Sequence, residues 1–345
     1  MANEREQSPA HREDWLALVK EEPLEPETPV IDPHHHLWDH RNSRYLLEEI
    51  LRDTGSGHGV LGTVFVECMS MYRKDGPDAM KSIGETEFVN GIAAQSASGR
   101  YGDTRVAAGI VSFVDLTLGA AAREVLQAHM AVAPERFRGI RHAAGWDAHP
   151  DVANSHTNPT RDLYDSAKFR EGFAQLAPLG LTFDAWQYHP QIPELTRLAR
   201  AFPATTIIFD HFGGPLGTGP YEGKRAEIFP KWKDDVTELA KCPNVVAKLG
   251  GINMAVNGFG WHRRPKPATS DELVAATGDY YFHAIDKFGP ARCMFESNFP
   301  VDRVSCSYVV LWNAFKKMAA RYNEEERADL LRRTAARVYR LKLGA

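Results

Sequence analysis

Three consecutive histidines near the N-terminus carry the clearest chemical signal in this 345-residue chain. They follow a short apolar run within residues 31–39, and successive side chains of an extended strand point to opposite faces. Asp32, His34 and His36 should therefore share one face, while His35 points away. Two imidazoles at this spacing can hold one cation or polarise one substrate group. A solvated histidine run is the alternative, and it is less favoured where the run ends a buried strand.

A second histidine signal lies in residues 207–215, which read Ile-Ile-Phe-Asp-His-Phe-Gly-Gly-Pro. His211 leaves an apolar run and enters a turn, so we expect a metal-binding or catalytic role, with a capping contact to the loop as the alternative. Glu67, at the end of another apolar run, and His189, before a proline in a loop, are further candidate metal ligands. For His189, ligation and loop packing stay equally open.

Eight apolar runs separated by helical patterns must position these side chains. Most runs are apolar throughout, which is typical of strands buried on both faces. The alternation fits a (β/α)8 barrel or an open doubly wound sheet. Because polar residues end many of the runs rather than those at one switch point, we predict a distorted (β/α)8 TIM barrel of the α/β class. The predicted strands are residues 29–36, 61–69, 104–115, 137–144, 181–186, 205–212, 244–252 and 293–300.

Loop lengths support a catalytic barrel. Long segments follow the second, fourth, sixth and seventh predicted strands. The segment after the sixth strand covers residues 213–230. All of them begin at the carboxyl ends of strands, where barrel enzymes build their sites. Residues 1–28 form an acidic, proline-containing N-terminal arm with one short helix near residues 12–20, and residues 29–345 form the barrel.

Composition bounds the functional class. The formal net charge is −4 and hydrophobic residues make up 43% of the chain, so no basic footprint for nucleic acid is present. The four scattered cysteines favour free thiols in a reducing compartment. No signal peptide or membrane-length apolar run is visible, which predicts a cytoplasmic protein acting on a small molecule. The sequence is compatible with a homo-oligomer and does not specify the oligomeric state.

Five motifs in order resemble those of the amidohydrolase-related metal-dependent hydrolases, the branch that contains 2-pyrone-4,6-dicarboxylate lactonase, fuconolactonase and sulfomuconolactone hydrolase. They are Ile-Asp-Pro-His-His-His-Leu-Trp-Asp, Gly-Ile-Arg-His, Phe-Asp-His-Phe-Gly-Gly-Pro, Asn-Val-Val-Ala-Lys-Leu-Gly-Gly and Cys-Met-Phe-Glu-Ser-Asn-Phe-Pro-Val-Asp. The resemblance covers nearly the whole predicted barrel. It implies the opening of lactones or related carbonyl compounds, with a divalent cation in some members and without one in others. Zinc is the cation we expect first.

One departure from the family pattern bears on catalysis. Where the resemblance implies an aspartate that activates water or binds metal, this chain has Asn298. An amide cannot take a proton from water and is a weaker metal ligand than a carboxylate. Glu296 shares the inward face by strand parity and is our first candidate for the base, with a structural ion pair as the alternative. Asp302 and Glu67 are further carboxylates within reach.

Candidate substrate contacts surround this centre. Arg141 and His142 end the fourth predicted strand, and a guanidinium there can bind a carboxylate, although a buried ion pair is equally expected. Lys248 lies on the seventh strand, with the same alternative, and Asp184 on the fifth. Trp261 begins an aromatic and basic stretch in a long loop, which is either a lid or a solvated segment.

These residues predict a hydrolase that opens a small lactone or related cyclic carbonyl compound carrying a carboxylate. The histidines, with or without a cation, would polarise the carbonyl while a carboxylate activates water. A non-oxidative decarboxylase is the alternative within catalysis, because it needs no water nucleophile. A catalytically inactive metabolite-binding barrel is the alternative outside it.

Overall fold

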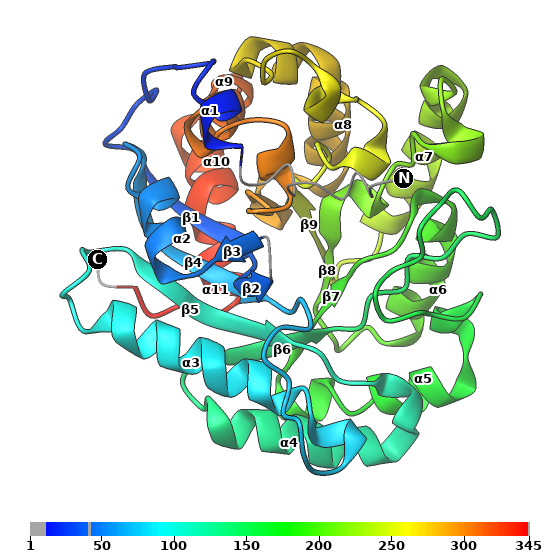
Figure 1. The fold of residues 1–345 in the computed structure, drawn as a ribbon. Coiled ribbons are helices and arrows are strands. Elements are labelled where there is room, and N and C mark those ends of the chain that lie inside the picture. The colour runs from blue at the N-terminus through cyan, green and yellow to red at the C-terminus, as the bar shows by residue number, and fades with distance from the viewer. Residues whose placement is uncertain (1–11, 41–42, 344–345) are drawn as a thin grey trace, which may run out of the picture.

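The computed structural model describes residues 12–40 and 43–343. Eight parallel strands are hydrogen-bonded in the order β1-β4-β5-β6-β7-β8-β9-β10, and helices cover the outside of this sheet (Figure 1). Each predicted strand is present, so the eight-stranded prediction is confirmed. The strands are β1 (Pro29–His35), β4 (Gly59–Val66), β5 (Arg105–Ser112), β6 (Phe137–Arg141), β7 (Thr182–Ala185), β8 (Ile207–Phe209), β9 (Val245–Leu249) and β10 (Cys293–Phe295).

The sheet closes between the end of β1 and the segment after β10. His36 N–H donates to the carbonyl of Phe299 at 2.8 Å, and Asn298 N–H donates to the carbonyl of His34 at 2.9 Å. His35 and Phe299 form an isolated parallel bridge. The predicted barrel is confirmed, and its closure places the segment that follows β10 directly beside the histidines of β1.

The outer helices follow most of the predicted helical patterns. One boundary was wrong: α7 begins at Arg225 with Pro230 inside it, whereas we predicted a loop over residues 213–230. A short β2–β3 hairpin (Trp38–His40, Ser43–Tyr45) follows β1. The helices are α1 (Glu13–Leu16), α2 (Leu47–Thr54), α3 (Ile83–Ala97), α4 (Ala122–Val132), α5 (Ala167–Phe173), α6 (Ile192–Ala201), α7 (Arg225–Ala240), α8 (Ser270–Phe288), α9 (Tyr308–Ala319), α10 (Glu324–Ala328) and α11 (Thr334–Val338).

Two apolar layers hold the barrel together. The larger lies between the strands and the outer helices. The smaller fills the barrel interior with strand residues such as Ile31 and Val64, and Val338 and Tyr339 from the C-terminal segment close it from below. Burial of such side chains stabilises the fold by roughly 1.5–3 kcal/mol each. The polar side chains at the strand ends therefore rest on a packed apolar floor.

The described part of the N-terminal arm lies along the barrel. Trp15 Nε1–H donates to the carbonyl of Arg264 at 3.0 Å, and Leu24 N–H donates to Asn313 Oδ1 at 2.8 Å. These contacts join the arm to the loop after β9 and to α9. The first eleven residues of the predicted arm lie outside the described residues. The predicted helix of the arm is shorter than expected, since α1 covers only Glu13–Leu16.

Two predictions from composition bear on the described residues. Cys68, Cys242, Cys293 and Cys306 are all free thiols, as predicted. Within residues 12–40 and 43–343, every helix is too short or too polar to cross a membrane.

Candidate active site

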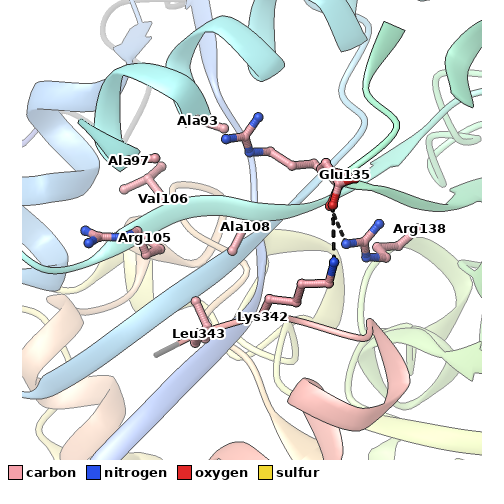
Figure 2. Close-up of a pocket in the computed structure, with 10 residues that line it drawn as sticks. Ala93, Ala97, Arg105, Val106, Ala108, Glu135, Arg138, Lys342 and Leu343 are labelled. Carbon is pink, nitrogen blue, oxygen red and sulfur yellow. Dashed lines mark hydrogen bonds and ion pairs between the residues drawn. The ribbon is translucent and has the colours of Figure 1, made fainter. Parts of the chain in front are cut away.

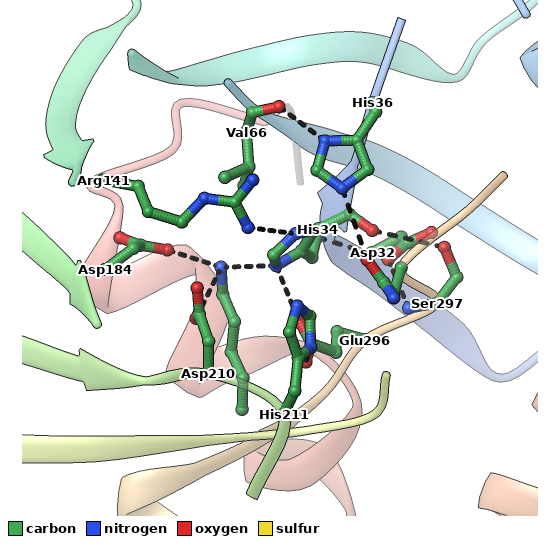
Figure 3. Close-up of polar contacts among 12 residues, drawn as sticks. Asp32, His34, His36, Val66, Arg141, Asp184, Asp210, His211, Glu296 and Ser297 are labelled. Atoms are coloured by element: carbon green, nitrogen blue, oxygen red, sulfur yellow. Dashed lines mark hydrogen bonds and ion pairs between the residues drawn. The ribbon is translucent and has the colours of Figure 1, made fainter. Parts of the chain in front are cut away.

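His34, His211 and Glu296 meet at the carboxyl end of the barrel (Figure 3). His34 comes from β1, His211 follows β8, and Glu296 directly follows β10. The two imidazole rings lie 4.5 Å apart between centroids. His211 Nδ1 lies 2.7 Å from Glu296 Oε1, and His34 Nδ1 lies 2.8 Å from Glu296 Oε2. One carboxylate from the eighth barrel strand therefore contacts histidines from the first and the sixth.

The backbone near His211 is held in an uncommon conformation. His211 has φ 53° and ψ 38°, in the left-handed region that costs a non-glycine residue on the order of 1 kcal/mol. A Cβ built on Gly251 would lie 2.1 Å from His211 Nδ1, so only glycine fits there. The Gly-Gly pair after β9 thus makes the space in which the His211 ring meets Glu296.

Two buried cations also contact His34, Lys248 at Nδ1 and Arg141 at Nε2. Lys248 Nζ is 3.2 Å from His34 Nδ1, donates to Asp184 Oδ2 at 2.6 Å and lies 3.5 Å from Asp210 Oδ1. Arg141 NH1 lies 3.4 Å from His34 Nε2. Both cations are paired with carboxylates, Lys248 with Asp184 and Asp210 and Arg141 with Glu67, so the site contains buried ion pairs next to His34.

Burial sets the protonation of this cluster. It raises the pKa of Glu296 to about 8 and that of Asp210 to about 7, against opposing attraction from Lys248. It lowers the pKa of His211 to about 3, and that of His34 well below its usual value, where the nearby Lys248 lowers it further. Both imidazoles are therefore neutral near pH 7, and Glu296 exchanges a proton close to neutrality.

His34, Asp210 and His211 form a donor set that fits a divalent cation. Each offers one ligand atom, and these atoms all lie within 4.8 Å of one another. Asp210 Oδ2 is buried without a hydrogen-bond partner and Oδ1 has only the ion pair with Lys248 at 3.5 Å, so the carboxylate has lone pairs available for a cation. Two imidazoles and one carboxylate are a common zinc ligand set. Glu296 would then orient the His211 ligand from behind, through Nδ1.

His36 and Asn298 form a separate pair beside the cluster. His36 Nδ1–H donates to the carbonyl of Val66 at 2.8 Å, and its Nε2 lies 3.3 Å from Asn298 Oδ1. Asn298 Nδ2 donates to Asp302 Oδ1 at 3.1 Å. Burial raises the pKa of Asp302 to about 8. The structure places Asp302 behind Asn298, so the amide separates this carboxylate from the histidines.

Glu67 belongs to a third group, at the end of β4. Arg141 Nε–H donates to Glu67 Oε1 at 2.6 Å, and His156 Nε2 lies 2.9 Å from Glu67 Oε2. Attraction from Arg141 and His156 overcomes burial and lowers the pKa of Glu67 to about 2. A carboxylate so fully paired is not a metal ligand in this conformation, which corrects our assignment of Glu67. Arg141 keeps one nitrogen, NH1, directed at His34.

Three predicted site residues lie outside the cluster. His142 accepts a hydrogen bond from Leu116 N–H at Nδ1 and packs against aromatic rings, so it is a packing residue rather than a substrate contact. His189 accepts from Leu216 N–H at Nδ1, which supports loop packing over metal binding. Trp261 is buried against Phe259 in the loop after β9. These placements correct our assignments.

Our sequence reasoning missed Asp210, His156 and Trp186. Asp210 precedes His211, and strict strand parity would point the two side chains apart; the left-handed backbone at His211 lets both reach the cluster. His156 lies in a long loop where nothing in the spacing marks it. Trp186, just beyond β7, packs edge-on against the His211 ring at 4.9 Å between centroids. The position of Trp186 at the end of a predicted strand could have marked it as a site residue.

Comparison with known proteins agrees with this geometry. The family model described as Amidohydrolase matches residues 31–341. The chain belongs to the amidohydrolase family. This confirms the resemblance seen in the sequence motifs and makes the protein an enzyme of a hydrolase family.

Several relatives of this amidohydrolase span nearly its whole length. The uncharacterized protein y4mH of Sinorhizobium fredii is 31% identical over 335 residues, covering 90% of this chain and 98% of its own. An L-fucono-1,5-lactonase of Burkholderia multivorans is 27% identical over 323 residues, covering 90% and 96%. A crystal structure of a Burkholderia multivorans amidohydrolase with bound zinc has 26% identity and a TM-score of 0.68, covering 91% of this chain and 100% of its own.

Proposed function

We propose that this amidohydrolase opens a small lactone that carries a carboxylate, by attack of water on the ring carbonyl. One observation carries the proposal: Glu296 is a buried carboxylate at the centre of the site, with Oε1 2.7 Å from His211 Nδ1 and Oε2 2.8 Å from His34 Nδ1. A base with a pKa near the working pH is efficient at removing a proton from water. The likeness to L-fucono-1,5-lactonases supports a lactone as the substrate class.

In this mechanism Glu296 Oε2 exchanges its contact with His34 for the attacking water, accepts a proton from that water, and returns the proton to the ring oxygen as the C–O bond of the lactone breaks. His211 donates its Nδ1 proton to Oε1 and so fixes the carboxylate in place. Lys248 supplies buried positive charge for the oxyanion that develops at the carbonyl, where such charge is most effective. A divalent cation, when held by His34, Asp210 and His211, would supply Lewis-acid polarisation of the same carbonyl.

The substrate carboxylate is assigned to NH1 of Arg141, whose contact in the described residues is with His34 Nε2 at 3.4 Å. Two of the three guanidinium nitrogens are bound to Glu67, one to its side chain and one to its backbone carbonyl, which holds the group rigidly. NH1 remains directed into the site. Trp186, against His211, and Trp38, stacked on His36 at 5.9 Å, offer flat apolar surfaces to the substrate ring.

Asn298 supports one second candidate, a non-oxidative decarboxylase. The amide at this position cannot activate water, and Asp302 lies behind it. Decarboxylation needs no water nucleophile, so this reaction would not require an aspartate at position 298. The buried carboxylate of Glu296, in contact with both His34 and His211, favours hydrolysis over this alternative because it can replace the lost base.

An activity screen separates the two candidates. Purified protein, supplied with zinc or treated with chelator, is incubated with a panel of lactones that includes L-fucono-1,5-lactone, and with a panel of aromatic carboxylates. Acid release is followed with a pH indicator, and carbon dioxide release is followed separately. We expect acid release from a carboxylated lactone. Carbon dioxide release from an aromatic carboxylate, with all lactones intact, would replace the lactonase proposal by the decarboxylase.

A further inference from the structure

A second pocket lies at the opposite end of the barrel from the histidine cluster. It is formed by the start of β5, the start of β6 and the C-terminal segment after α11 (Figure 2). Arg105 is the first residue of β5 and Arg138 the second of β6, whereas the histidine cluster lies where the strands end. The pocket has a volume of about 230 Å3. It is therefore separate from the active site.

Positive charge dominates the lining of this pocket. Four of the lining side chains are cationic and one is a carboxylate, that of Glu135. Lys342 Nζ lies 3.3 Å from Glu135 Oε2, so this carboxylate is shared with one cation. Arg105 and Arg136 donate to neutral oxygens, those of Asp103 and Asn90. Within residues 12–40 and 43–343, no ion pair joins Arg105, Arg136 or Arg138 to a carboxylate, although Glu135 lies near enough to Arg138 to oppose the lowering of its pKa.

Arg138 is the most unusual member of this group. Its side chain is buried, with 8% of the residue exposed, and its guanidinium donates only to the backbone carbonyls of Phe137 and Glu135. Its Nε–H is buried without any partner. Burial lowers the pKa of Arg138, and repulsion from Arg340 lowers it further. A buried guanidinium ordinarily has an anionic partner, so the missing one points to a ligand.

We propose that this pocket binds a small oxyanion with two or three negative charges, the chemistry shared by a phosphate group and a small polycarboxylate. The lining has four cationic side chains and one carboxylate, which gives a net charge of +3. A ligand with two or three negative charges would neutralise most or all of it. Planar guanidinium groups match both kinds of oxyanion through paired hydrogen bonds. Figure 2 shows Glu135 joined to both Arg138 of β6 and Lys342 of the C-terminal segment, so a bound anion would contact cations from both parts of the chain.

Calorimetric titration of the full-length protein with inorganic phosphate, and separately with citrate, tests the proposal at low ionic strength. We expect saturable binding of one anion per chain, and the tighter of the two identifies the ligand class. The double variant Arg138→Met/Lys342→Met should weaken binding at least 10-fold. Because Arg138 is buried, the more exposed Arg105→Glu serves as a second variant that leaves the interior intact and should also weaken binding.

Two matched variants locate the binding. Arg123→Met removes an exposed cation on α4 outside the pocket and should leave the affinity within twofold. Arg141→Met removes a cation of the active site and should also leave it unchanged. The proposal is overturned if neither anion binds saturably, or if Arg141→Met abolishes binding while the Arg138/Lys342 variant retains it. Both results are independent of whether the active site hydrolyses lactones.

Discussion

Replacement of Glu296 by glutamine isolates its role as a base. The amide oxygen can still accept the Nδ1 proton of His211, at the 2.7 Å contact of Oε1, while the amide nitrogen replaces Oε2 at 2.8 Å from His34 Nδ1 and donates to it. The fold and both histidines stay in place, and only proton acceptance is lost. We expect turnover to fall by about 100-fold or more, the usual contribution of a general base.

The pH dependence gives the same variant a second readout. Burial raises the pKa of Glu296 from 4.5 to about 8, so the unionised form is favoured in the folded protein. Wild-type kcat/KM should therefore rise with pH through an apparent pKa near 8, and Glu296→Gln should lose this limb. The raised pKa contributes stability that is complete below pH 4.5 and is lost as the pH rises toward 8. The glutamine variant lacks this loss. The Tm of the variant minus the Tm of wild type should therefore increase as the pH rises from 5 to 8.

The assay is continuous acid release from the lactone found in the screen. Glu194→Gln is the matched control, because Glu194 on α6 also has a pKa raised by burial, to about 7, and an oxygen without a partner, yet lies outside the cluster. It should keep turnover within twofold. Near-normal turnover by Glu296→Gln, with an unchanged pH profile, would refute the assignment of Glu296 as the base.

Three further predictions address the surrounding residues. Gly251→Ala places a methyl group 2.1 Å from His211 Nδ1 at a backbone φ of 64°, so turnover should fall at least 10-fold with a lower Tm; wild-type kinetics would show that the ring is free to move. Asp210→Asn should weaken zinc binding at least 10-fold in a titration followed by calorimetry, whereas unchanged affinity would remove Asp210 from the donor set. His156→Asn removes the partner of Glu67 Oε2 and should raise KM about fivefold with little change in kcat; a selective loss of kcat would instead assign His156 to the chemistry.

The barrel could be predicted from sequence because its strands are buried on both faces. Continuous apolar runs such as that ending at Phe209 are typical of parallel strands, and all eight were present at the expected places. The boundary of α7 could not be predicted, because Pro230 ordinarily interrupts a helix. Its position there depends on tertiary packing that no local pattern contains.

The site could be predicted only where strand parity holds. Glu296 lies two residues after Met294, which faces the barrel interior, and it meets His34 as parity requires. Parity already fails on β1, whose register shifts between Asp32 and His35: Asp32 accepts from Tyr308 of α9 instead of sharing the face of His34, which corrects our prediction for Asp32. Parity fails at His211, where the left-handed backbone brings Asp210 to the same cluster. Glu67 and His142 were assigned from residue type and strand-end position. Residue type cannot show whether a partner such as His156, distant in the sequence, will occupy the side chain.

The most direct test of the account is the fate of solvent oxygen during lactone opening. Hydrolysis is run in water enriched in oxygen-18, and the product acid is examined by mass spectrometry, both at single turnover and at many turnovers. If Glu296 acts as a base for water, the product carries one solvent oxygen in its carboxylate from the first turnover, and Glu296 itself acquires none. An unlabelled product in the first turnover, with label appearing only later, would mean that a carboxylate of the enzyme attacks the carbonyl, and it would contradict the mechanism.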